Sequence, residues 1–396
     1  MISFKQMMAQ GFGRVLKISL LAFIAVTAFG VYDFTIPYFT EEISESLMII
    51  GITVSLMYVA SFFFEIPLGL AVDRFGRKKV MLASLAGLVA MGALYFFAEQ
   101  IWQLMVMGFV FGTIAVAFWI PEAVLIRDYS PKKMYGLSES VYLAISQVGW
   151  IIGPIIAGIA ATQLDLKYNF LLFSALVSVG IVYAGLTLER DSVRGQQRKQ
   201  AKLFALAKSF KEFIGIHKYA LPLYVLSIAV NIWVGIEWVF VQIAGSNVFG
   251  LSEGAVGAVL GGMMAVEGLL YLSSGYLMDK VGAKYIMLAG FLLLFSAAYF
   301  AFLSTNAYMF VFFLLLAGGS VAWIAPGTEA LATTIIPENK RGEMTGVFNS
   351  AADIGLMLGP LLGGIFGQFL GGPMIPFVYV AIVAGVAVFI SLKLWK

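Results

Sequence analysis

The chain has 396 residues, of which 61% are hydrophobic and 12% charged, with a net charge of +3 at pH 7. Soluble domains are about half apolar and about a quarter charged, so most of this chain must be solvated by lipid. The absence of cysteine and the single histidine, His217, exclude disulfides, thiolate metal sites, cysteine nucleophiles and histidine proton relays. The small net charge gives no indication of a nucleic-acid partner.

Twelve apolar segments follow one another along the chain. About 20 mostly apolar residues cross the hydrocarbon core as a helix, which is the length used to identify them. Six segments lie in the first half, at 14–40, 45–71, 78–98, 101–126, 136–162 and 167–188. Six lie in the second half, at 219–245, 254–277, 284–304, 307–335, 343–370 and 373–394. The sequence therefore predicts an all-α membrane protein with 12 transmembrane helices.

The distribution of charge predicts the orientation of these segments, because basic loops stay on the cytoplasmic side of a membrane. If both termini are cytoplasmic, Lys167 is the only one of the 25 Lys and Arg residues that falls on the opposite face. That face carries acidic side chains instead: Glu41, Glu42, Glu45, Glu99, Asp165 and Glu253. We therefore expect a multi-pass protein of the inner membrane with both termini in the cytoplasm.

A polar stretch separates the sixth and seventh segments. Residues 189–218 hold more Lys and Arg than acidic residues, and 202–216 could form an amphipathic helix on the membrane surface. Binding of anionic lipid is one role for this stretch, and a linker that fixes the topology is the simpler role that we favour. The predicted organisation is a six-helix bundle over 1–188, a cytoplasmic linker over 189–218 and a second six-helix bundle over 219–396.

Two motifs occur once in each half of the chain, and both copies are displaced by 206 residues. The first motif comprises Gly69, Asp73, Arg74, Gly76 and Arg77 between segments two and three, and its copy comprises Gly275, Asp279 and Gly282 between segments eight and nine. The second comprises Gly149, Gly153, Pro154 and Gly158 in segment five, and its copy comprises Gly355, Gly359, Pro360 and Gly364 in segment eleven. One offset for two separate motifs indicates a duplicated six-helix unit. Transporters built from such parallel repeats bind substrate between them.

These motifs carry a family resemblance that extends over essentially the whole chain. The first resembles the signature loop of the major facilitator superfamily, and the Gly-Pro motif resembles the one associated with that family's 12-helix drug:proton antiporters. The resemblance implies two pseudo-symmetric six-helix bundles that alternate access to a central site. Segment four departs from the antiporter pattern, because Leu104 to Ala117 holds no arginine and Arg127 lies at the cytoplasmic end instead.

The resemblance also implies a cytoplasmic gate. Asp73 would bind the N-terminus of segment eleven near Glu343, where a helix dipole stabilises a carboxylate by roughly 0.3–1 kcal/mol. Arg74 and Arg77 would hold Asp73 in place, and Asp279 would face the start of segment five near Gly136. Charges that only hold the orientation are the alternative. The small residues of the Gly-Pro motif permit close helix approach, so either static packing or a moving hinge fits them.

Seven carboxylic acids lie inside the apolar segments, and no Lys or Arg lies at comparable depth. Each ionised carboxylate facing lipid at mid-membrane costs about 2.5–3.5 kcal/mol. We therefore expect them to line a hydrated cavity, to be protonated, or both, with a structural hydrogen bond explaining one or two. They fall into three near-symmetric tiers through the membrane: Asp33 and Glu237 in the outer parts of their segments, Glu65 and Glu267 near the middle, and Glu122 and Glu329 toward the cytoplasm, with Asp353 in addition.

An acidic cavity attracts cations, and protons compete with them for the same carboxylates. Trp233 and Trp238 flank Glu237, and Trp119 precedes Glu122; their rings could stabilise a cation, although ordinary packing explains any one of them. We expect a secondary transporter that exports cationic or amphipathic small molecules in exchange for protons by alternating access. No cofactor or metal is expected, and a monomer suffices because one chain supplies both halves of the site.

Two other functions remain open from the sequence. An importer or uniporter of a sugar, metabolite or metal cation would use the same fold, and the missing arginine in segment four favours it. A membrane-embedded enzyme or receptor is disfavoured, because the chain has no HExxH, no GxxxxGK[ST] and no nucleophile–histidine pairing.

Overall fold

A computed structural model describes residues 12–130, 135–189, 220–335 and 341–393, and the side chains of 135–136 and 341–346 are not part of that description. Within these ranges every regular element is an α-helix, and all twelve helices are long and apolar enough to cross a membrane. This confirms the predicted fold class. A helix satisfies its own backbone hydrogen bonds, which is why it is the form that apolar segments adopt in lipid.

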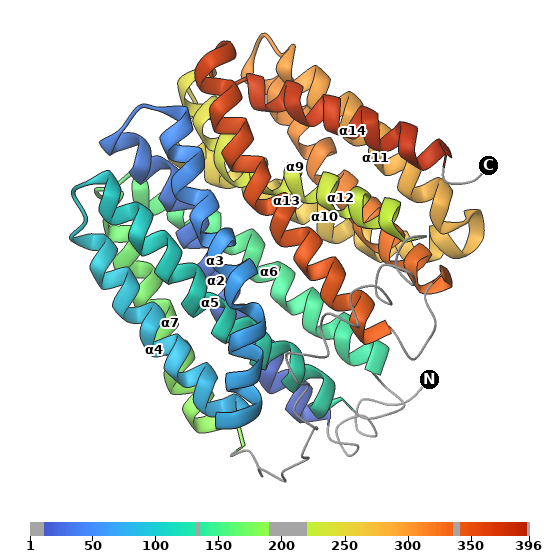
Figure 1. Cartoon of the computed structure of the whole chain (residues 1–396). Helices are drawn as coiled ribbons and strands as arrows, with labels where there is room; N and C mark the ends of the chain where they lie inside the picture. Colours follow the sequence, from blue (N-terminus) through green and yellow to red (C-terminus); the bar gives the residue numbers. More distant parts are fainter. Residues whose placement is uncertain (1–11, 131–134, 190–219, 336–340, 394–396) are drawn as a thin grey trace.

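The first six helices come from the first half of the chain and the last six from the second half (Figure 1). The first six are α2 (Phe12–Ile43), α3 (Leu47–Phe75), α4 (Arg77–Phe96), α5 (Ile101–Tyr129), α6 (Tyr135–Ala161) and α7 (Tyr168–Thr187). The last six are α9 (Leu221–Asn247), α10 (Glu253–Val281), α11 (Ala283–Phe302), α12 (Ala307–Ile335), α13 (Arg341–Leu370) and α14 (Ile375–Lys393). Most of the basic linker falls in 190–219, outside the described residues.

The internal repeat is visible in how the helices begin and end. Ser46 caps the N-terminus of α3 and Ser252 caps that of α10, each through its side-chain oxygen. Gly76 ends α3 with a φ of 88°, and Gly282 ends α10 with a φ of 105°. Both pairs are displaced by 206 residues. A residue with a Cβ would be strained at such a φ, which explains why glycine occupies this place in both copies of the first motif.

The two ends of the bundle differ in charge. We call the end that carries Glu41, Glu42, Glu45, Glu99, Asp165 and Glu253 the acidic end, and the opposite end, where α2 begins and α14 ends, the basic end. In Figure 1 the helices run obliquely between them, from the acidic end at the upper left to the basic end at the lower right. Helices α3 and α13 pack along one another, as do α6 and α10, and these two contacts join the halves.

The Gly-Pro motif makes close contacts both within a half and between the halves. Gly153 packs α6 against α2, since a Cβ there would lie 2.7 Å from the Thr27 carbonyl oxygen and 2.8 Å from the Gly30 Cα. Gly158, on the same helix, packs α6 against α10, with a Cβ position 2.5 Å from the Glu253 carbonyl oxygen and 3.2 Å from the Gly254 Cα. Its repeat equivalent, Gly364, packs α13 against α3 in the same way, 3.2 Å from the Gly51 Cα. We call these two glycine-lined contacts, α6 with α10 and α3 with α13, the seams.

Candidate functional site

A cavity of about 390 Å³ lies between the two halves, lined by residues of α2, α3, α5, α6, α9 and α13. Three of the seven predicted carboxylates line it together: Asp33 of α2, Glu65 of α3 and Asp353 of α13. Its described lining residues include no Lys, Arg or His. The cavity therefore presents three carboxylates, and its described wall supplies no counter-charge.

Aromatic rings form much of the remaining wall: Phe29, Tyr58, Trp119, Trp150 and Trp238. The rings of Trp150 and Trp238 lie 5.4 Å apart between centroids and come from opposite halves. Phe29 and Trp119 lie 5.0 Å apart within the first half. Such a wall offers π faces to a cation and apolar surface to an amphipathic molecule.

Helix periodicity explains how the acids and their neighbours reach the same wall. Each acid has another lining residue four positions earlier on its helix: Phe29 before Asp33, Ser61 before Glu65 and Asn349 before Asp353. Residues four apart share one face of a helix. Asn349 also lies within reach of the Glu65 carboxylate, so α3 and α13 meet at a polar contact.

The sequence did not single out these neighbours, nor Tyr58 and Trp150. The four-residue spacing was a signal that could have found Phe29, Ser61 and Asn349 once the three acids were chosen. Trp150 had no such signal, because no predicted acid lies on α6.

The other four predicted acids do not line this cavity. Glu122 and Glu237 are each 1% exposed, and Glu267 is 9% exposed. One carboxylate oxygen of Glu237 lacks a hydrogen-bond partner among the described residues, as does the indole nitrogen of Trp233 one turn earlier. Glu267 of α10 lies close enough to interact electrostatically with Glu237 of α9. Glu329 is exposed on the surface of α12.

The predicted tryptophans are divided in the same way. Trp119 and Trp238 line the cavity. Trp233 is fully buried inside the second half, with its ring centroid 6.4 Å from that of Phe377. Trp233 is therefore placed to support the Glu237 region and not to meet a molecule in the cavity.

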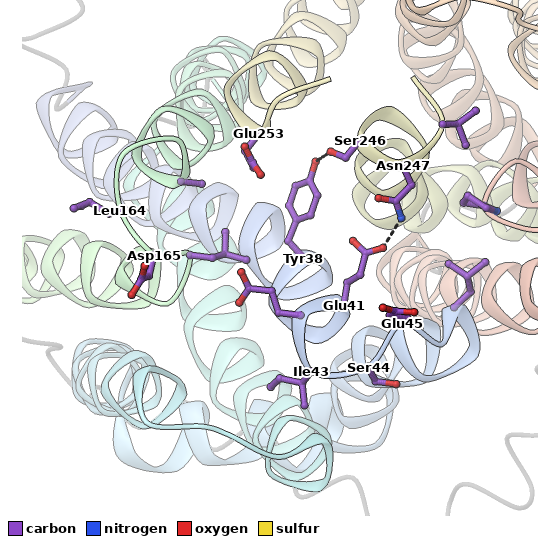
Figure 2. A pocket seen from close by; sticks show the side chains of 16 residues that line it. Tyr38, Glu41, Ile43, Ser44, Glu45, Leu164, Asp165, Ser246, Asn247 and Glu253 are labelled. Atoms are coloured by element: carbon purple, nitrogen blue, oxygen red, sulfur yellow. Dashed lines mark hydrogen bonds between the residues drawn. The ribbon is translucent and has the colours of Figure 1, made fainter. Parts of the chain in front are cut away.

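Hydrogen bonds join the two halves at the acidic end, as Figure 2 shows. The Tyr38 hydroxyl lies 2.6 Å from Ser246 Oγ, and Asn247 donates to Glu41 Oε1 at 2.6 Å. Glu41 and Asn247 are repeat equivalents, so this contact joins the same position of the two halves. Deeper in, Gln242 of α9 donates to the backbone oxygen of Asp33 at 3.2 Å. These bonds hold α2 against α9 above the central cavity.

A second, larger cavity of about 1010 Å³ opens beside this closure (Figure 2). We call it the outer vestibule. Five acidic residues line it: Glu41, Glu42, Glu45, Asp165 and Glu253. Lys167 lies 3.8 Å from Asp165, which gives the vestibule one basic neighbour.

The first motif lies at the basic end, where Asp73 and Arg74 are exposed and Arg77 forms an ion pair with Asp128 of α5. Lys78 donates to the Gly185 carbonyl oxygen at 2.9 Å, so the loop also reaches α7. Asp279, in the second copy, is exposed as well. The side chains of Glu343 and Gly136, the predicted partners of the two aspartates, lie outside the described residues. The latch therefore stays a prediction.

The family model described as Major Facilitator Superfamily matches residues 18–247 and 220–396. Among proteins of similar sequence, the class B tetracycline resistance protein of Escherichia coli is 24% identical over 317 residues, covering 79% of this chain and 77% of its own. The multidrug resistance protein MdtG of Yersinia enterocolitica is 26% identical over 365 residues, covering 86% and 83%. An uncharacterized MFS-type transporter of Methanocaldococcus jannaschii is 22% identical over 360 residues, covering 90% and 92%.

Solved structures show the same fold at lower sequence identity. The nucleoside transporter NupG superposes with a TM-score of 0.78 at 14% identity, covering 97% of this chain and 99% of its own. A bacterial homologue of the human lysosomal transporter Spinster, in an inward-facing and occupied conformation, superposes with a TM-score of 0.79 at 14% identity, covering 96% of both chains. Both of these structural neighbours are transporters.

Proposed function

Because the chain belongs to the major facilitator superfamily, and so is a secondary transporter and not an enzyme, we propose that it exports cationic or amphipathic small molecules in exchange for protons. The observation that carries this proposal is the central cavity, which combines three carboxylates with aromatic walls and has no basic residue among its described lining. Its volume of about 390 Å³ is in the range of pockets that hold drug-sized molecules.

Competition between protons and substrate gives the coupling. Three carboxylates in a partly apolar cavity repel one another, and each one that is ionised loses hydration, so the empty cavity favours bound protons. A cationic substrate stabilises the ionised form and displaces protons when it binds. A transporter that opens the cavity to one side at a time would thereby exchange substrate for protons.

The closed acidic end supports alternating access. Two seams and the bonds of Tyr38 and Asn247 join the halves at the acidic end, between the central cavity and that side of the bundle. We propose that the basic end faces the cytoplasm, as its Lys and Arg residues predict, so that the described state is the one that receives substrate from the cytoplasm. The two halves of the cavity come from one chain, and a monomer would suffice.

Resistance proteins among the relatives favour efflux, whereas the nucleoside transporter among the structural neighbours favours a specific metabolite. Import or uniport of such a metabolite is therefore the second candidate. The acidic lining favours a cationic substrate, because three carboxylates without a counter-charge would not help to bind a neutral metabolite. Transport of a probe by purified protein separates the two.

The experiment is flux of a fluorescent cation, ethidium, into proteoliposomes under an imposed pH gradient. Variants Asp33→Asn, Glu65→Gln and Asp353→Asn each remove one cavity charge, and Glu99→Gln removes an exposed charge at the acidic end as a matched control. A unit charge at about 5 Å contributes about 3 kcal/mol at an effective dielectric constant of 20, before loss of hydration, so each cavity variant should weaken binding at least about tenfold. Ethidium flux that is the same with and without the pH gradient would refute proton coupling. No movement of any cation by folded protein would favour the metabolite transporter.

A further inference from the structure

Glu122 does not line the central cavity, yet it is one of the two least exposed carboxylates in the described part of the chain. It lies seven residues before the end of α5, about 10 Å along the helix from the basic end. It is 1% exposed, and neither of its oxygens has a hydrogen-bond partner among the described residues. An ionised carboxylate in that position would carry most of the cost of desolvation, because within the described ranges only the Tyr142 hydroxyl lies within reach of it.

Three hydroxyl groups follow one another along the face of α6 that meets Glu122. Ser138, Tyr142 and Ser146 are spaced four residues apart, which places them on one helix face at intervals of about 6 Å. Tyr142 faces Glu122 and Ser146. The hydroxyls of Ser138 and Ser146 are buried, and neither has a partner among the described residues. We call Ser138, Tyr142 and Ser146 the hydroxyl ladder.

Unpartnered polar atoms concentrate at this place. Of the nine such buried side-chain atoms in the described ranges, four belong to Glu122, Ser138 and Ser146. Buried polar groups in proteins are nearly always hydrogen-bonded to protein or to ordered water. Hydroxyl groups both donate and accept, so a ladder of them with water between its steps can pass a proton along.

Among the residues that the structure describes, no basic side chain is placed to balance Glu122. Four helices pack against α5, namely α2, α3, α4 and α6. On α2, Lys17 is exposed and Arg14 is paired with Glu189. On α3, Glu65 lies in the central cavity, and on α4, Arg77 is paired with Asp128. On α5 itself, Arg127 is exposed. On α6 the titratable groups nearby are Tyr142 and Glu139, the second of which is itself acidic. An ionised Glu122 would therefore face no positive charge from the described parts of these helices.

Glu122 is nevertheless connected to the cavity. Trp119 lies one turn before it on α5 and lines the cavity, in contact with Phe29, which in turn lies one turn before Asp33. A substrate that displaces the Trp119 ring would shift the same turn of α5 that carries Glu122. A shift of Trp119 on binding would thus reach Glu122 through one turn of α5.

We propose that Glu122 is the proton-carrying residue of the transport cycle, distinct from the substrate-binding carboxylates Asp33, Glu65 and Asp353, and that the hydroxyl ladder conducts its proton to and from the basic end. The step is a proton transfer between water and the Glu122 carboxylate, with no other bond changed. This assignment rests on the proposed proton-coupled transport for its role in the cycle, but not for the protonation of Glu122 itself.

Infrared difference spectroscopy tests the proton site without any substrate. Purified wild-type protein, taken from acidic to alkaline pH, should lose a carboxylic-acid carbonyl band. That band should be missing in Glu122→Gln and retained in Tyr142→Phe and Ser146→Ala. A wild-type spectrum without the band, or a band that Glu122→Gln leaves unchanged, would overturn the proposal even if transport proves to be proton-coupled.

Transport assays then test the role of Glu122 in the cycle. In ethidium-loaded proteoliposomes, Glu122→Gln should keep ethidium/ethidium exchange within about twofold of wild type while pH-driven accumulation falls at least about tenfold. Glu65→Gln should lose both activities. Ser146→Ala and Tyr142→Phe should slow pH-driven accumulation more than exchange. Full pH-driven accumulation by Glu122→Gln, or equal loss of both activities in a folded variant, contradicts the assignment. If wild-type protein moves no ethidium, the proposed function fails and the infrared result still decides the proton site.

Discussion

The seams between the halves allow a prediction about the equilibrium between transport states. Gly158→Ala adds a methyl group at a position 2.5 Å from the Glu253 carbonyl oxygen and 3.2 Å from the Gly254 Cα. Both atoms are backbone of α10, so no side chain can rotate away. Helices α6 and α10 must separate, and they belong to different halves. The strain therefore falls on the state with a closed acidic end and is relieved when that end opens.

The size of the effect follows from the overlap. Carbon and oxygen atoms in ordinary contact lie about 3.3 Å apart, so the added methyl group requires a displacement of about 0.8 Å. Overpacking of this kind costs about 1–3 kcal/mol. An equilibrium constant shifted by that free energy changes about 5–150-fold toward the state with an open acidic end. Gly364→Ala, the repeat equivalent in the other seam, should shift the equilibrium in the same direction, because its Cβ would overlap the Leu47 carbonyl oxygen.

The chain has no cysteine, so a pair of spin labels can be attached directly at new cysteines. Leu164→Cys and Val248→Cys place labels on exposed residues of opposite halves beside the outer vestibule. Pulsed electron paramagnetic resonance should show the short distance giving way to a longer one in Gly158→Ala. Gly185→Ala is the matched control, because nothing lies within 4 Å of its Cβ position. An unchanged distance distribution in Gly158→Ala, with the protein folded, would show that the seam does not open during the cycle.

Three further predictions concern other contacts between the helices. Gly153→Ala should destabilise the protein by about 1–3 kcal/mol without changing the label distance, because its clash with Thr27 and Gly30 lies inside one half. Thermal unfolding in detergent measures this loss of stability. Asn247→Asp replaces the hydrogen bond to Glu41 with two facing carboxylates, so the label distance should lengthen at neutral pH. It should shorten again at acidic pH, where one proton between the two carboxylates restores a hydrogen bond, and Glu41→Gln with Asn247→Asp should remove this dependence on pH. Tyr95→Phe removes the buried hydrogen bond to Tyr32 and should lower the free energy of unfolding by about 0.5–1.5 kcal/mol; an unchanged unfolding temperature would show that Tyr32 finds another partner.

The fold was predictable because its determinants are local and repeated. Twelve apolar segments of sufficient length can form only helices in lipid, and the 206-residue offset made the duplication evident. The structure adds physical reasons for particular residues of the motifs. Gly76 and Gly282 end helices at positive φ, and Gly158 and Gly364 bring backbones of opposite halves into contact.

The site was harder to predict, because depth along a helix does not determine the direction in which a side chain points. Depth alone places Glu65 and Glu267 in one tier, yet Glu65 lines the cavity while Glu267 is buried on α10 outside it. It places Glu122 and Glu329 in another, and one is buried while the other is exposed. Similar sequence positions thus lead to different environments, since the helix rotation and the neighbouring helices decide which face is covered.

The asymmetry between the two halves indicates how the work of transport is divided. The contacts that join the halves are duplicated: Gly158 has its equivalent in Gly364, Gly51 in Gly257, and Glu41 meets its own equivalent, Asn247. The cavity acids are not duplicated, for the positions equivalent to Asp33, Glu65 and Asp353 are Val239, Tyr271 and Gln147. A rocking motion about a central axis needs matching contacts on both sides, whereas recognition of one substrate in one orientation needs unlike walls. If this division is correct, substitutions in the seams will change the populations of the states, and substitutions of the acids will change what is bound and what drives it.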